Sequence, residues 1–180
     1  MKTNLLTLAM ALITVTAFSQ KLTTTSAVIA FDATTPLDKL PKAENKTVIA
    51  SVNTQTGAVA FEALIKNFAF SNPRIQEHFN QPNWMDSDKY PTATFTGKIT
   101  NLAAVNFSKN GTYTADVEGD LTMHGQTKPI KTKAYVTVNG KSVRAMTEFE
   151  VKLADFSIDG PAVGAGKVAK DPKINVLVDF

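Results

Sequence analysis

The clearest pattern in the chain is a strict alternation of apolar and polar residues between Thr112 and Met123. One parity carries mostly apolar side chains, namely Tyr113, Ala115, Val117, Gly119, Leu121 and Met123, and the other carries threonines and acids. Only a β-strand has a side-chain period of two residues. The segment is therefore predicted to be a strand with one dry face and one wet face. The dry face mixes large residues with alanine and glycine.

Seven further segments have the composition or the alternation of strands. They are residues 22–31, 46–52, 58–65, 92–100, 130–138, 143–153 and 174–180. The first of them has an ambiguous parity, so its inner face is not assigned. In the others, one parity is mainly apolar.

The segments between these strands carry turn chemistry. Asn110-Gly111 and Asn139-Gly140 are strong hairpin signals, and residues 54–57 and 124–129 are also predicted to be turns. Residues 74–85 lack alternation; with Pro73 ahead of them and Pro82 within them, they predict one short helix. Residues 157–172, rich in glycine, proline and alanine, are expected to form a loop.

These elements predict an all-β fold, an eight-stranded antiparallel barrel with one short helix. A long antiparallel sheet must close or fold over to cover its apolar face, and a two-sheet sandwich is the alternative. Eight strands enclose a space that side chains can fill or that can hold one small ligand. Alternation alone leaves both a solid core and an apolar cavity open.

Residues 1–19 have the features of a secretory signal peptide, which leaves 20–180 as the barrel domain. Lys2 supplies the positive charge, residues 5–17 are mostly apolar, and Ala17 and Ser19 are small residues suited to cleavage before Gln20. The apolar run is short for a membrane span. We therefore expect a periplasmic or secreted protein with no stable membrane span after cleavage.

Composition removes several classes of function. The absence of cysteine excludes disulfides, thiol catalysis and cysteine-bound zinc. The formal net charge of +3 is spread among interspersed acids and bases without a basic tract, so nucleic acid is not an expected partner.

Candidate catalytic groups are sparse. Glu77 and His78, with Asp86 and Asp88 further on, form the one cluster that resembles a site for general acid–base catalysis. The simpler interpretation is that Glu77 and His78 orient a short helix or hold a loop against the barrel. His124 is expected to be a turn residue that hydrogen-bonds to backbone. No enzyme activity, cofactor or metal is predicted.

Trp84 and Met85 form an apolar pair close to Pro82. This pair could guard the mouth of a barrel or plug one end of its core.

Three runs resemble the YceI-like family of bacterial exported proteins. They are EHFN at 77–80, WMDSDKYPTATFTG at 84–97 and VEGDLTMHGQTKPI at 117–130. The resemblance extends over the mature chain and implies a lipocalin-like barrel that binds polyisoprenoid chains in its interior, without catalytic residues to transfer. The approach to the last strand, residues 160–173, departs from the family's usual sequence.

The combined prediction is a binding protein that holds a long isoprenoid or other lipid chain for transport, storage or sequestration. The residues expected to contact the chain are Phe61, Phe95, Tyr113, Val117, Leu121, Val136, Phe149 and Val151. A tail longer than the barrel is compatible with an exposed mouth or a homodimer. The alternative is a ligand-free barrel that acts as a stress-response or protein-interaction module.

Overall fold

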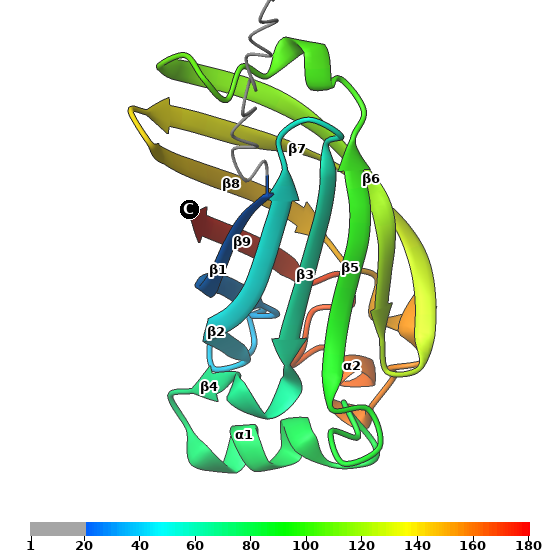
Figure 1. Cartoon of the computed structure of the whole chain (residues 1–180). Helices are drawn as coiled ribbons and strands as arrows, with labels where there is room; N and C mark the ends of the chain where they lie inside the picture. The colour runs from blue at the N-terminus through cyan, green and yellow to red at the C-terminus, as the bar shows by residue number, and fades with distance from the viewer. Residues whose placement is uncertain (1–20) are drawn as a thin grey trace, which may run out of the picture.

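A closed antiparallel barrel forms the body of the protein (Figure 1), as the computed structural model of the chain shows for residues 21–180. The predicted signal peptide, 1–19, lies outside the described residues. Eight long strands make the barrel: β1 (Lys21–Asp32), β2 (Lys42–Asn53), β3 (Ala58–Leu64), β5 (Thr92–Ile99), β6 (Gly111–Met123), β7 (Gln126–Asn139), β8 (Ser142–Glu150) and β9 (Lys173–Asp179).

Strand order rules out the sandwich alternative. The sheet runs β1-β9-β8-β7-β6-β5-β3-β2, and a further β1–β2 pairing joins its two ends. A two-residue strand, β4 (Ala69–Phe70), adds to the side of β2. The predicted eight-stranded antiparallel barrel is confirmed.

Helical segments are short and lie outside the strand ladder. Helix α1 (Pro73–Asn80) starts with Pro73 at its first turn and is capped by the Asn72 side chain, which accepts a hydrogen bond from Arg74 N. It lies across one end of the barrel, at the bottom of Figure 1. The stretch that was expected to be a plain loop contains α2 (Pro161–Gly164), and 3₁₀ turns span 65–67, 102–104 and 153–156.

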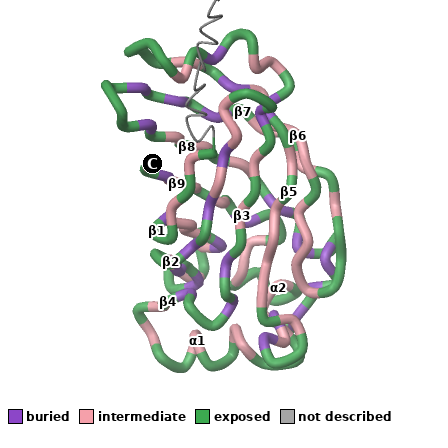
Figure 2. The backbone as a smooth tube through the Cα atoms, viewed as in Figure 1, coloured by how far each residue is buried: buried purple, intermediate pink, exposed green. Residues whose placement is uncertain are grey.

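The outer face carries charged pairs in register. Asp116 lies opposite Lys133 and Glu118 lies opposite Lys131, with ion-pair distances of 2.6 and 3.0 Å. These pairs are exposed and contribute little stability, but a slip of one residue would turn them into the dry interior. Figure 2 shows the resulting alternation of exposed and less exposed positions along the strands.

The turn at His124-Gly125 is tighter than expected. His124 (φ 49°) and Gly125 (φ 72°) form a two-residue connection, and β7 begins at Gln126, so Pro129 lies within a strand opposite Asp120. Proline lacks a backbone donor and is tolerated at a free strand edge. This part of β7 pairs with β6 but has no partner in β8, because the pairing of β7 with β8 begins at Ala134 of β7.

Strands β1 and β2 meet through irregular pairing. Their register shifts between Thr24 and Ala27 and again between Ala27 and Ile29. The fully buried Asn45 side chain stabilises this region by donating to Leu64 O at 2.9 Å and accepting from Thr47 N at 2.9 Å. The irregularity explains why the parity of residues 22–31 was ambiguous in the sequence.

Two glycines bring β5 and β6 close together. Gly97 and Gly119 are register partners, and a Cβ on Gly119 would lie 2.5 Å from Gly97 Cα and 2.7 Å from the Phe95 ring. The Phe95 ring therefore lies over the space that the two absent side chains leave. An aromatic residue placed over a glycine pair compensates for the lost packing.

Replacing Gly119 with alanine is expected to destabilise the barrel by about 1–3 kcal/mol, because the added methyl group overlaps backbone that cannot easily move. Urea unfolding followed through Trp84 fluorescence measures the change. Gly164→Ala is the control, since a Cβ there meets nothing within 4 Å. Equal unfolding midpoints for Gly119→Ala and Gly164→Ala would contradict the packing argument.

Candidate functional site

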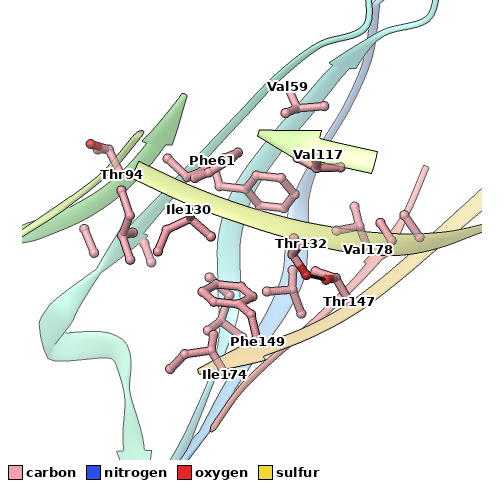
Figure 3. A pocket seen from close by; sticks show the side chains of 18 of the residues that line it. Val59, Phe61, Thr94, Val117, Ile130, Thr132, Thr147, Phe149, Ile174 and Val178 are labelled. Carbon is pink, nitrogen blue, oxygen red and sulfur yellow. Dashed lines mark hydrogen bonds between the residues drawn. The ribbon is translucent and has the colours of Figure 1, made fainter. Parts of the chain in front are cut away.

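The barrel encloses an apolar cavity of about 220 Å³. All eight long strands contribute to its wall, and Figure 3 shows side chains from several of them converging on the same space. Phe61 and Phe149 place aromatic rings against it. The solid-core alternative is therefore wrong for this barrel.

The chemistry of the wall is almost uniform. No charged residue lines the cavity in the described part of the chain, and four lining residues carry a hydroxyl group: Ser51, Thr94, Thr132 and Thr147. Ser51 and Thr94 alternate with the inward Val52 and Phe95, so they occupy outward positions of their strands. Thr132 and Thr147 have inward parity and hydrogen-bond to each other, Oγ1 to Oγ1, at 2.8 Å.

Aromatic rings gather where α1 covers the barrel. Phe31 from β1 stacks on Phe79 from α1 with centroids 5.7 Å apart, and Phe68 lies 5.9 Å from Phe79. Phe70 lies 4.9 Å from Phe79 and completes the cluster. Phe31, Phe68 and Phe79 also line the cavity, and we call these three residues the aromatic floor. They close the end of the cavity nearest α1.

Seven of the eight residues predicted to contact a ligand lie on the cavity wall. They are Phe61, Phe95, Val117, Leu121, Val136, Phe149 and Val151. Tyr113 is not among the lining residues of the described chain. Its hydroxyl donates to Lys109 O at 2.8 Å and its ring lies against Gly111, because a phenol at the end of a strand can reach a loop carbonyl.

Several lining residues were missed because they lie outside the regular alternation. Phe68, Phe79, Met85 and Phe107 come from a turn, a helix and connecting segments. Ile29 and Phe31 come from the irregular strand β1. The apolar pair Trp84–Met85 was the signal in the sequence that indicated part of this set, because it predicted a residue at a barrel mouth or at one end of the core.

The Trp84–Met85 pair plugs one end of the core. Met85 is buried with Ile65 and Phe156, and it reaches the cavity wall. Trp84 is half-buried and packs over Gly160, where a Cβ would lie 3.1 Å from the indole ring. The glycine thus leaves room for the ring.

The two histidines have separate, local surroundings. His124 Nδ1 lies 2.8 Å from Phe156 O and its ring meets Tyr90 edge-on at 5.0 Å, which confirms its prediction as a turn residue bonded to backbone. His78 is exposed near the end of α1, and Asp88 pairs with Lys66 at 2.6 Å. In residues 21–180, no group of three or more histidine or acidic side chains could hold a metal ion.

Comparison with known relatives gives partial sequence matches. A UPF0312 protein of Pseudomonas putida is 36% identical over 108 residues, which is 56% of this chain and 50% of the relative. A UPF0312 protein of Pseudomonas savastanoi pv. phaseolicola is 36% identical over 93 residues, or 47% of this chain and 44% of the relative. The chain thus spans about half the length of the curated relatives it matches.

Solved structures share the fold at low sequence identity. A polyisoprenoid-binding domain from Saccharophagus degradans, implicated in plant cell wall breakdown, has a TM-score of 0.70 at 14% identity, covering 86% of this chain and 93% of that domain. BcnA of Burkholderia cenocepacia has a TM-score of 0.72 at 17% identity, covering 86% and 96%. Residues 8–180 match the YceI-like domain, and the chain therefore belongs to that family.

Proposed function

We propose that the protein is a non-enzymatic carrier that holds an apolar, isoprenoid-like chain inside its barrel. One observation carries this proposal: a cavity of about 220 Å³ with no charged residue among the residues of 21–180 that line it. Apolar cavities stay dry and accept apolar guests. The solved domain from Saccharophagus degradans, which binds polyisoprenoids and shares this fold, supports the same class of ligand.

The size of the cavity limits how much of a chain it holds. A cavity of about 150 Å³ holds one benzene molecule, so by proportion about nine carbon atoms fit in 220 Å³. A longer isoprenoid must rotate lining side chains or protrude through a mouth. Each methylene-sized group that is buried contributes roughly 0.8 kcal/mol, so even this volume supports useful binding.

A periplasmic or secreted location fits a carrier whose cargo is poorly soluble in water. We propose this location from the leader-like sequence at 1–19. Within residues 21–180, no helix has both the length and the apolar character needed to span a bilayer.

Protein purified under native conditions from the producing cell is expected to contain about one lipid per chain. Organic extraction followed by mass spectrometry measures this content, because a dry apolar interior retains its guest through purification. Clean extracts together with no binding of an apolar dye would favour the ligand-free interaction module instead.

A homodimer would cover a lipid tail that protrudes from the barrel. Size-exclusion chromatography of the lipid-bound and the lipid-free protein tests for such a lipid-dependent homodimer.

Filling the cavity is expected to weaken lipid binding. Ala145→Leu places three more carbon atoms on the cavity wall, and the loss of about three methylene-sized contacts corresponds to roughly a fifty-fold higher Kd. The measurement is titration of lipid-stripped protein with farnesol. Ala60→Leu is the matched control, because Ala60 is exposed on β3. Unchanged affinity in a correctly folded Ala145→Leu protein would place the ligand elsewhere.

Cleavage of the leader is expected to leave Gln20 as the first residue of the exported protein. Ala17→Leu puts a large side chain at a position that the signal peptidase reads, so the precursor should accumulate. Phe18→Leu, at the position between the two small residues, should be processed normally. Intact-mass measurement of periplasmic and membrane fractions detects both forms, and normal processing of Ala17→Leu would overturn the cleavage assignment.

A further inference from the structure

Strands β7 and β8 part in the middle of the barrel wall. Their ladder ends at the pair Ala134 and Thr147, although β7 extends back to Gln126 and β8 continues to Glu150. At the point where the two strands separate, two backbone carbonyls accept hydrogen bonds from threonine hydroxyl groups. Thr147 Oγ1 donates to Lys133 O at 2.9 Å, and Glu148 O lies 3.3 Å from Thr132 Oγ1.

The two threonines lie side by side on the cavity wall. Their Oγ1 atoms are 2.8 Å apart, and Figure 3 shows them turned toward each other from neighbouring strands. Both side chains are half-buried. Among the described residues, they are the hydroxyl-bearing side chains at inward positions of the lining, so they are the nearest partners for a polar group of a guest.

Hydrogen-bond capacity shows what the pair can offer. Each hydroxyl has one proton and two acceptor sites. If Thr147 donates to Lys133 O, Thr132 donates to Thr147 Oγ1; if Thr147 donates to Thr132 Oγ1, Thr132 donates to Glu148 O. Protein oxygens take both protons in either arrangement. Each hydroxyl oxygen of the pair therefore keeps at least one unused lone pair.

We propose that the Thr132–Thr147 pair is a polar subsite that accepts a hydrogen bond from a donor group, such as a hydroxyl, on an otherwise apolar ligand. This inference rests on the proposed function and refines its substrate class. The cavity should prefer a prenyl alcohol to the corresponding ether. An ether oxygen can only accept hydrogen bonds, and the site already consists of acceptors. On entering the cavity, the ether oxygen therefore loses its hydrogen bonds to water and gains none from the protein.

Calorimetric titration of lipid-stripped protein with geraniol and with geranyl methyl ether tests the subsite. The ratio of the two Kd values in the wild-type protein is compared with the ratio in Thr132→Val, which keeps the shape of the side chain and removes its oxygen. The ratio is expected to shift by about fivefold against the alcohol, the effect of one neutral hydrogen bond. Comparing ratios cancels the contribution of the extra methyl group in the ether.

Matched variants separate recognition from structure. Thr127→Val breaks a hydroxyl pair of the same 2.8 Å length with Thr122 that does not line the cavity, and it should keep the wild-type ratio. Thr132→Ser restores the hydroxyl and should restore the ratio. If Thr132→Val does not fold, Thr147→Ser and Thr147→Val make the same comparison at the partner position.

The outcomes distinguish the two proposals. Binding of both probes with the same ratio in wild type and Thr132→Val would overturn the polar subsite and leave the carrier function standing. Failure of wild-type protein to bind either probe would overturn the carrier function and the subsite together. A shifted ratio in Thr127→Val as well as in Thr132→Val would show a general stability effect and would also overturn the subsite.

Discussion

Closure of the sheet at β1 is the constraint on which the rest of the molecule depends. This strand pairs with β2 along most of its length and with β9 from Val28 to Asp32. Without both pairings the sheet would expose two edges and its apolar face would open to water. Closure converts that face into an enclosed wall, so the backbone holds the interior open without requiring that side chains fill it.

Alternation of side chains was enough to predict the barrel, because a period of two residues specifies both the strand and its inner face. The segment 112–123 illustrates this, since its register with β7 places Asp116 and Glu118 beside lysines outside and Val117 and Leu121 on the cavity wall. The same reasoning located seven of the eight proposed contact residues on that wall. Tyr113 has the correct parity, but its hydroxyl finds an acceptor in the adjoining loop.

Features that interrupt the alternation could not be predicted in this way. The bulged pairing of β1 hides its inner face, and Pro129 resembles a turn residue although it lies on a free edge of β7. The aromatic floor combines residues far apart in the sequence, which no local period connects. Whether the inward residues leave a void depends on how side chains from all strands meet, and this is a property of the assembled wall.

The aromatic floor has a mechanical consequence. The wall is held by directional hydrogen bonds between strands, whereas Phe31, Phe68 and Phe79 meet through ring contacts that impose no single geometry. Rotation of these rings exchanges one set of dispersion contacts for another and breaks no ladder bond. A guest longer than the enclosed space would therefore displace these rings toward α1 more easily than it would spread the strands of the wall.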